Sequence, residues 1–398
     1  MSDQTKTHPL PLDGVRVIDF TQVMLGPCCT QMLADYGAEV IKVEKAKIGD
    51  LSRWSLGEDP DGLNNPVFCS LNRNKKSLAL DLKEPPAKEA VLRLIDGADV
   101  VVNNFRPGVM DRIGFGYETL KARNPRLIFA EGSGYGNDGP YVHKGGQDVL
   151  AQAMSGVMDR RADPDLPFSI YPTALCDYSA GMHLVQGILL ALMQRERTGE
   201  GQRVGVSLYN SMLAMQMQEA AMHMMRAKEL NWAAMPLTGV FETADGAITM
   251  VGAFKPNPLA DICTALGFED LSKEERLSTL DRQREHRSEL QARFRERFRQ
   301  EKTAYWLQRL EDVDILCAPV KSLAEALEDE QTLVNRMIVE AGHSQTGPMR
   351  LVGTPIDMSA APLEVRHMPP QLGEHNAEIL EGLGIAADGL AGQPEKVA

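Results

Sequence analysis

The chain has few cysteines and lacks the paired spacing that metal sites require. Its six cysteines are scattered over 398 residues, at Cys28, Cys29, Cys69, Cys176, Cys263 and Cys317. Zinc and iron–sulfur sites bring several ligands together at short, regular intervals, and no such pattern is present. We therefore expect reduced thiols, a cytoplasmic location and no metal.

Positive charge is also in deficit. Lys and Arg number 42 against 55 Asp and Glu, which gives a formal net charge of -13. Nucleic acids and anionic membrane surfaces select for clustered Lys and Arg, so we expect neither as a partner. The start, MSDQTKTHPL, has no apolar signal region, and we expect no export.

A long apolar run of the kind that crosses a bilayer is missing as well. The uncharged stretch between Asp177 and Arg195 falls short of about 20 apolar residues and contains Ser179 and His183. It predicts a buried helix instead, ending before the breaker TGEG. Asp177 has two interpretations: a structural N-cap, or a carboxylate nucleophile beside a patch of N–H donors.

The remaining pattern alternates strands and helices. Strands are expected at residues 15–20, 39–44, 78–82, 99–102, 126–130 and 203–208, with helices at 28–36 and 86–95 among those between them. This order predicts an α/β fold with a parallel, Rossmann-like sheet covered on both faces. The first turn, FTQVMLGPCC, has only one glycine, which argues against a dinucleotide fingerprint although Glu44 stands where such enzymes hold a ribose.

Three polar loops should lie at the carboxyl ends of these strands, at residues 72–76, 103–108 and 132–136. Ligands bind at that edge in open parallel sheets. The Arg and Lys residues of the loops either bind phosphate or are solvated surface charges.

The second half of the chain does not continue the alternation of strands and helices. A hairpin is expected at residues 240–251 around Asp245-Gly246, then a helix at 259–266 and a charged, solvated helical region at 274–311. Before it, a helix rich in methionine, from Met212 to Met225, predicts core or subunit-interface packing.

Eight segments occur in a familiar order: GVRVIDFTQVMLGP, LADYGAEVIKVE, NRNKKSLALDLK, NNFRPGVMDRIGFGYE, NPRLIFAEGSGYGNDGP, QDVLAQAMSG, ALCDYSAGMHLVQGILLALMQRERTGEGQRVGVSL and LGEHNAEIL. In them the sequence resembles the class III coenzyme A transferases, the family of formyl-CoA transferase and carnitine CoA-transferase. Alpha-methylacyl-CoA racemase is a relative of that family. The resemblance covers almost the whole chain.

The resemblance implies that Asp177 is the nucleophile and that coenzyme A passes from an acyl-CoA donor to a carboxylic acid. The route would run through an aspartyl anhydride and an aspartyl-CoA thioester. Acyl-CoA is then a substrate, and no cofactor is permanently bound. The helix N-terminus should keep Asp177 ionised, and its N–H groups should stabilise the oxyanion of each tetrahedral step.

Two neighbours complete the implied catalytic group. Asp148 matches an acidic position near the nucleophile, with an N-cap of the next helix as the alternative. Gln147 stands where the racemase branch has His, and a neutral amide can donate hydrogen bonds but cannot take up a proton. We therefore expect transfer, with racemase-like isomerisation or a non-catalytic CoA-binding protein as alternatives.

The resemblance also implies a coenzyme A site on the first domain, formed by Val23, Met24, Lys45, Leu80, Asn104, Phe105 and Arg112. Phe105 would pack on pantetheine or adenine, while Lys45 and Arg112 suit phosphates. Met24 replaces a Gln of formyl-CoA transferase, and that enzyme's glycine-rich flap is missing around residues 232–240. We therefore expect a small mono- or dicarboxylic acceptor, somewhat larger or less polar than formate or oxalate.

Members of the family form interlocked homodimers, and the resemblance implies the same here. The domains would be a large Rossmann-like CoA-binding domain with its linker helix over residues 1–229, and a small α+β domain over 230–325. Residues 326–398 would form a linker and a C-terminal return to the large domain.

Overall fold

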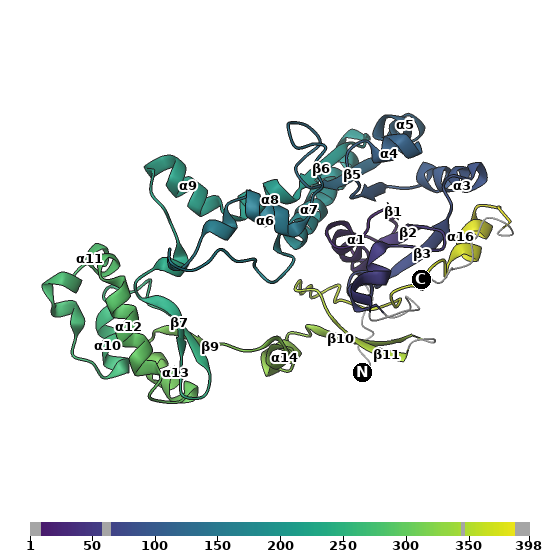
Figure 1. Ribbon diagram of the computed structural model, residues 1–398. Coiled ribbons are helices and arrows are strands. Elements are labelled where there is room, and N and C mark those ends of the chain that lie inside the picture. The colour runs from purple at the N-terminus through teal and green to yellow at the C-terminus, as the bar shows by residue number, and fades with distance from the viewer. Residues whose placement is uncertain (1–8, 58–64, 344–346, 387–398) are drawn as a thin grey trace. The chain divides into compact units, whose positions relative to one another are not determined.

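The computed structural model describes residues 9–57, 65–343 and 347–386 (Figure 1). Contacts divide the chain into two compact units. The larger takes residues 1–157, 170–216 and 331–398, and the smaller takes 158–169 and 217–330. These limits differ from those of the expected domains, because the segment 158–169 packs with the small unit, where Arg160 donates to the Leu230 carbonyl.

A six-stranded parallel sheet forms the centre of the large unit. Its strands are β1 (Arg16–Asp19), β2 (Glu39–Lys45), β3 (Lys75–Leu80), β4 (Val100–Asn103), β5 (Ile128–Ser133) and β6 (Arg203–Ser207). They lie in the order β3-β2-β1-β4-β5-β6, with every pair parallel. The α/β class and the parallel sheet are thus confirmed. The strand order reverses between β1 and β4, which is where such sheets place a ligand.

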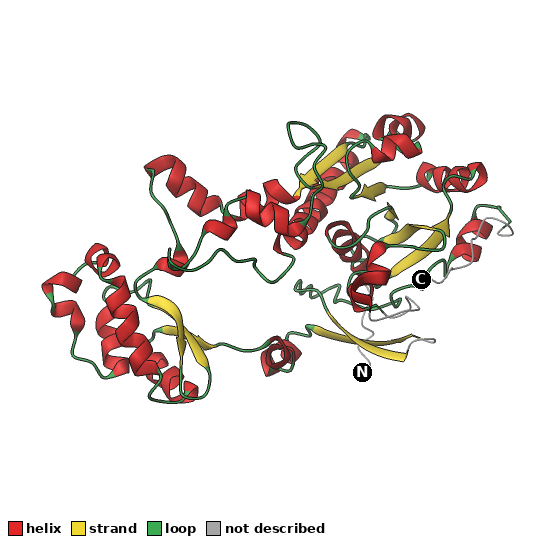
Figure 2. Cartoon of the chain, in the orientation of Figure 1, coloured by secondary structure: helices red, strands yellow, loops and turns green. Residues whose placement is uncertain are grey.

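Helices cover both faces of this sheet (Figure 2). One face carries α1 (Leu25–Asp35), α6 (Asp148–Met154), α7 (Leu175–Thr198) and α8 (Leu208–Met215). The other carries α3 (Pro85–Asp96), α4 (Val109–Ile113), α5 (Tyr117–Arg123) and α16 (Asn376–Gly382). Successive strand residues alternate between these two cores, as Val17 and Ile18 do, because side chains of a strand point to opposite faces.

Helix α1 begins earlier than expected. It starts at Leu25, so Pro27 is its third residue and not its first. Proline is tolerated there because the amides of the first turn have no partner within the helix. A short 3-10 segment, η1 (Leu51–Gly57), and helix α2 (Pro66–Cys69) follow β2.

Helix α7 is only partly buried, and the expectation that nearly every side lies inside the protein is wrong. Leu190 is 66% exposed and Met193 is 61% exposed, while Leu184 and Ile188 are buried against the sheet. With 24 residues it is long and apolar enough to cross a membrane by length and composition. That is weak support for a membrane span, since core helices pass the same test, and α7 packs on α1 and the sheet.

The small unit is built on an antiparallel sheet of β7 (Thr238–Glu242), β8 (Ala247–Val251) and β9 (Leu316–Pro319), in that order. The expected hairpin is therefore confirmed. Its helices are α9 (Met217–Arg226), α10 (Pro258–Leu266), α11 (Leu280–Glu285), α12 (Arg287–Phe298), α13 (Thr303–Glu311) and α14 (Leu323–Leu327), with short 3-10 turns η3 (Trp232–Ala234), η4 (Leu271–Lys273) and η5 (Glu275–Leu277) between them.

The charged region of the small unit is not merely a solvated surface. It supplies Phe294, Phe298 and Trp306 to the core, and all three are fully buried. The indole N–H of Trp306 donates to the carbonyl of Phe298 at 2.7 Å, so the polar end of this large side chain is satisfied. The charged residues occupy the opposite faces of α12 and α13.

The last part of the chain returns to the large unit. After α15 (Glu330–Val334) comes an antiparallel hairpin of β10 (Ile338–His343) and β11 (Gly347–Val352). Arg73 donates to the Val352 carbonyl at 2.7 Å. Helix α16 then lies beside the edge strand β3 (Figure 1).

Asn376, the first residue of α16, completes the edge of the sheet. Its side chain accepts from the Ala79 amide at 2.8 Å and donates to the Ala79 carbonyl at 3.1 Å. Asn376 is 8% exposed, so both backbone groups of β3 would lose their partners in its absence. The amide therefore acts as a one-residue extension of the sheet.

We predict that Asn376→Ala lowers the free energy of unfolding by about 2 kcal/mol, because it leaves a buried N–H and C=O unpaired. Urea unfolding measures this value. Glu378→Ala is the matched control on the same helix. The Glu378 side chain is 59% exposed in its ion pair with Lys76, and its removal should cost less than about 1 kcal/mol. Equal losses in the two variants would contradict the role of Asn376.

Candidate active site

A cavity of about 450 Å³ opens at the carboxyl ends of β1, β4 and β5. Its walls come from the loop after β1, the loop after β4, the segments 132–136 and 141–147 and the first turn of α7. This is the point where the strand order reverses. The fold therefore places a ligand cavity where parallel sheets usually carry one.

Six of the residues singled out from the sequence line this cavity: Val23, Met24, Asn104, Phe105, Gln147 and Asp177. Asp148 is buried directly behind Asp177. Three others lie outside the cavity. Lys45 and Arg112 are exposed, at the end of β2 and on α4, and Leu80 is fully buried in the core beneath the sheet.

Asp177 is the third residue of α7, and its expected role as the N-cap is wrong. The N-cap is Ala174, which has no side-chain cap. The capping carboxylate comes from Asp148, whose Oδ2 accepts from the amides of Cys176 at 2.6 Å and Asp177 at 2.9 Å. Its Oδ1 accepts from Gln152 at 2.6 Å. Asp148 thus caps the helix that follows it, α7, as its alternative interpretation predicted, and it does not cap α6, in which it lies.

The first amides of α7 are all occupied. Leu175 donates to the Thr173 carbonyl and Tyr178 to the Ala174 carbonyl, while the two amides between them bind Asp148. The expectation that these N–H groups stabilise an oxyanion is therefore wrong. Any oxyanion donor must come from elsewhere in the cavity wall.

The environment of Asp177 disfavours its charge. Burial and, to a smaller extent, the negative charge of Asp148 together raise the pKa of Asp177 to about 6, against the opposing effect of the Leu25 backbone amide. The N-terminus of α7 was expected to lower the pKa of Asp177. It does not, because its amides bind Asp148. Asp177 is still mainly ionised at pH 7. Beside it, burial and the charge of Asp177 raise the pKa of the Cys28 thiol to about 12, so that thiol is neutral.

The loop after β1 is held in a strained conformation. Val23 has φ of 67°, which is costly for a β-branched residue by roughly 1–3 kcal/mol. Every backbone group from Thr21 to the Val23 amide has a partner. Asp19 accepts from the Thr21 amide, and Lys42 donates to the Thr21 carbonyl. Asn104 binds both the amide and the carbonyl of Gln22.

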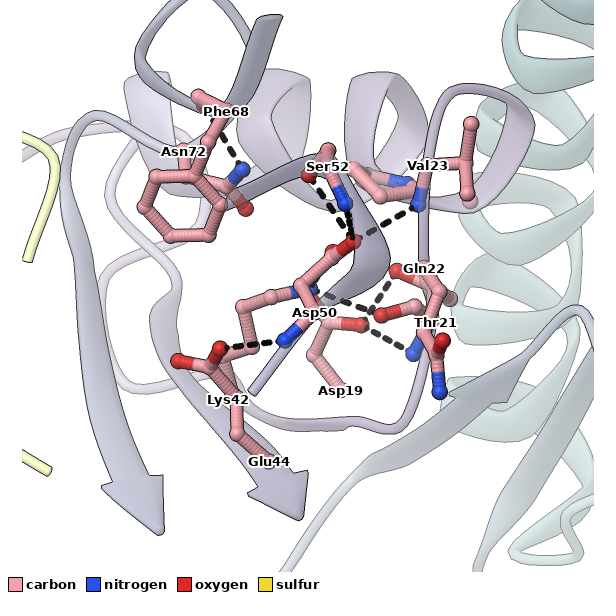
Figure 3. Close-up of polar contacts among 12 residues, drawn as sticks. Asp19, Thr21, Gln22, Val23, Lys42, Glu44, Asp50, Ser52, Phe68 and Asn72 are labelled. Atoms are coloured by element: carbon pink, nitrogen blue, oxygen red, sulfur yellow. Dashed lines mark hydrogen bonds and ion pairs between the residues drawn. The ribbon is translucent and has the colours of Figure 1, made fainter. Parts of the chain in front are cut away.

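The Val23 amide donates to Asp50 Oδ1 at 3.1 Å, which completes these contacts (Figure 3). Asn104 was expected at the coenzyme A site. It does line the cavity, but both ends of its side-chain amide hold the Gln22 backbone.

Six buried charges lie beneath this loop: Asp19, Glu44, Asp50, Lys42, Arg53 and Lys75, each no more than 4% exposed. Lys42 pairs with Asp50 at 2.8 Å, Arg53 with Glu44 at 2.8 Å and Lys75 with Asp19 at 3.3 Å. The Glu44 carboxylate, considered as a ribose ligand, instead binds Arg53 and Ser77. Sequence reasoning missed Lys42 and Asp50. The available signal was a lysine inside the otherwise apolar strand VIKV.

The comparisons with known proteins agree with this geometry. A family model described as CoA-transferase family III matches residues 12–376. The chain belongs to CoA-transferase family III. Among its relatives in this CoA-transferase family, the succinyl-CoA:glutarate CoA-transferase of Mus musculus is 34% identical over 380 residues, covering 93% of this chain and 86% of the relative.

A second relative is the formyl-CoA:oxalate CoA-transferase of Escherichia coli O157:H7. It is 33% identical over 428 residues, which cover 98% of this chain and 99% of the relative. A crystal structure of a CAIB/BAIF family protein from Brucella suis is 32% identical with a TM-score of 0.83, covering 94% of this chain and 100% of that one. The expected family is thus confirmed, and this CoA-transferase is an enzyme whose family acts on CoA thioesters.

We predict that Asp148→Asn lowers the pKa of Asp177. The variant removes the neighbouring charge that opposes ionisation, while the amide oxygen can still accept from the amides of α7. Carbodiimide labels protonated carboxyl groups, so the pH midpoint of Asp177 labelling, read by peptide mass spectrometry, reports the pKa. The midpoint should be near pH 6 in the wild type and lower in the variant.

Gln152→Leu is the control, because it removes a neutral partner of the same Asp148 carboxylate. Its midpoint should stay close to that of the wild type. A wild-type midpoint near the ordinary value of 3.8 would contradict the raised pKa.

Proposed function

We propose that this enzyme transfers coenzyme A from an acyl-CoA to a small carboxylic acid through covalent catalysis by Asp177. One observation carries the proposal: of the described residues that line the cavity, Asp177 is the one carboxylate. Since Asp148 provides the cap of α7, Asp177 has no structural task there. Its raised pKa increases the basicity of the carboxylate while leaving it mostly ionised at neutral pH.

The proposed reaction begins when the Asp177 carboxylate attacks the thioester carbonyl. The carbon–sulfur bond breaks, the thiolate of coenzyme A leaves, and a mixed anhydride forms. The thiolate then attacks the aspartyl carbonyl and releases the donor acid as its carboxylate. The enzyme now holds an aspartyl-CoA thioester.

The acceptor carboxylate reverses these steps. It attacks the aspartyl thioester, displaces the thiolate and forms a second anhydride, whose acceptor carbonyl the thiolate then attacks. Asp177 is regenerated and a new acyl-CoA leaves. One thioester replaces another, so the exchange needs no ATP. Gln147, which lines the cavity, is a suitable hydrogen-bond donor to the developing oxyanions.

Coenzyme A is proposed to enter along the first loop. Val23 and Phe105 line the cavity and offer apolar surface to the pantetheine chain. Lys45 and Arg112 are exposed outside it, where they suit the phosphates of the nucleotide. Leu80, which is fully buried, supports this region from the core without a free surface of its own.

The acceptor is proposed to be a small mono- or dicarboxylic acid. The named substrates of the two relatives, glutarate and oxalate, are both dicarboxylic acids. Met24 lines the cavity and presents an apolar, flexible side chain. An acceptor with some apolar carbon chain fits this wall better than formate or oxalate does.

The proposal includes a homodimer in the cytoplasm. Apolar side chains are exposed on three helices, namely Leu190 and Met193 on α7, Leu213 and Met215 on α8, and Met217, Met224 and Met225 on α9. Exposed apolar faces of this kind favour a protein partner, and a second copy fits the family. The six cysteines are free thiols, which suits a reducing compartment.

The covalent step can be tested directly. Incubation with acyl-CoA donor alone, followed by hydroxylamine, should modify Asp177 and leave other carboxylates unchanged in peptide mass spectrometry. Asp177→Asn should lower transfer by at least about 10³-fold while coenzyme A still binds. Asp138→Asn, which changes an exposed carboxylate, should keep wild-type activity. Near-normal transfer by Asp177→Asn would exclude the mechanism.

Transfer and racemisation differ at the carbon beside the thioester. A racemase must remove and replace that proton with an acid–base pair, and a neutral Gln147 cannot serve as the base. We therefore predict that a 2-methylacyl-CoA gains no deuterium at this carbon in deuterated water with the enzyme. Mass spectrometry of the acyl group measures the exchange, and rapid incorporation that depends on the enzyme would favour a racemase.

A further inference from the structure

We propose that Asp50, held in place by Lys42, is a positioning residue that sets the first loop against Asp177. The inference rests on the proposed function, because it concerns the same nucleophile. Neither Lys42 nor Asp50 lines the cavity. Their effect would reach the reaction through the backbone of residues 21–25.

Asp50 is fixed from several sides (Figure 3). Its Oδ1 accepts from the amide and the hydroxyl of Ser52, both at 2.8 Å, and from the Val23 amide at 3.1 Å. Its own amide donates to Glu44 at 2.9 Å. Burial opposes the charge, but Lys42 and these hydrogen bonds outweigh it and lower the pKa of Asp50 to about 2. Asp50 is therefore a permanently charged acceptor with a fixed position.

Lys42 makes a second connection between the Asp50 carboxylate and the first loop. Its ammonium lies 2.8 Å from Asp50 Oδ2 and donates to the Thr21 carbonyl at 2.7 Å. Lys42 is completely buried in the middle of β2, so its reach is set by the sheet itself. The pair thus binds the loop at two points, the Thr21 carbonyl and the Val23 amide.

The loop needs such contacts because Val23 stands in the left-handed region. A β-branched residue leaves that region readily when nothing holds it. Relaxation of Val23 would turn the peptide planes that lead to Leu25, the first residue of α1. Leu25 lines the cavity together with Asp177, and helix α1 packs on α7, so a shift of the loop changes the surface that faces the proposed nucleophile.

The neighbouring ion pair offers a natural control. Arg53 binds Glu44 and donates to the Pro370 carbonyl, all within the same buried set of charges. Glu44 makes no contact with residues 21–24 among the described hydrogen bonds. Glu44→Gln keeps a side-chain oxygen that can accept from the Asp50 amide and removes the charge that Arg53 binds, so it disturbs the buried charges without removing a contact of the loop.

The experiment compares Asp50→Ala, Asp50→Asn and Glu44→Gln in the full-length enzyme. Asp50→Ala should lower kcat by about 10- to 100-fold, with a smaller change in KM for acyl-CoA, because the nucleophile is misplaced more than the substrate site is lost. Asp50→Asn keeps an oxygen that can accept from Val23 but loses the charge that pairs with Lys42, so its kcat should fall less than that of Asp50→Ala. Glu44→Gln should keep kcat close to the wild type.

Amide hydrogen exchange provides a readout that is independent of turnover. The peptide covering residues 20–26 should exchange faster in Asp50→Ala and not in Glu44→Gln. Unchanged kcat and exchange in Asp50→Ala, or an equal fall of kcat in Glu44→Gln, would overturn the proposal. Should Asp50→Ala fail to fold, wild-type exchange decides, because a held loop must exchange slowly and rapid exchange contradicts it.

The experiments distinguish a failure of the proposed function from a failure of the positioning role. If the wild type transfers no coenzyme A to any acid, the reaction is wrong, while the exchange comparison still tests whether Asp50 holds the loop. If the wild type is active and exchange does not depend on Asp50, only the positioning role is wrong.

Discussion

The architecture of the site depends on three buried ion pairs. Three carboxylates and three cations lie buried under the first loop, and each has an oppositely charged partner within 3.3 Å. Isolated buried charges are very costly, so every member is restricted to the geometry that keeps its partner. That restriction spreads through β1, β2 and β3, which carry four of the six charges, and it holds the backbone that borders the cavity.

Asp148 and Asp177 have different roles at the N-terminus of α7. Asp148 binds the free amides of α7, a task for which a carboxylate is well suited. Asp177, in the first turn of the same helix, is left with few stabilising partners and a raised pKa. Asp148 makes the Asp177 carboxylate, the proposed nucleophile, more basic in two ways: it occupies the amide donors of α7, and it adds a second negative charge nearby.

Sequence reasoning reached the parallel sheet, the hairpin of β7 and β8 and the family, because these follow from periodicity, turn residues and ordered motifs. It misplaced the cap of α7, since the capping carboxylate stands 28 residues before Cys176 and only the fold brings them together. It overlooked Lys42 because one charged residue in a strand usually marks an exposed position. The apolar composition of α7 predicted a buried helix. The exposed Leu190 shows that burial depends on which side of the helix packs against other elements.

The return of the chain to β3 has a consequence for how the protein is made. Asn376 pairs with Ala79 across 297 positions of sequence, and the whole small unit lies between them. During synthesis, therefore, the Ala79 backbone at the edge of the sheet lacks this partner until residue 376 has emerged. Unpaired edges are prone to join other chains, so β3 is exposed to such association until α16 has been made.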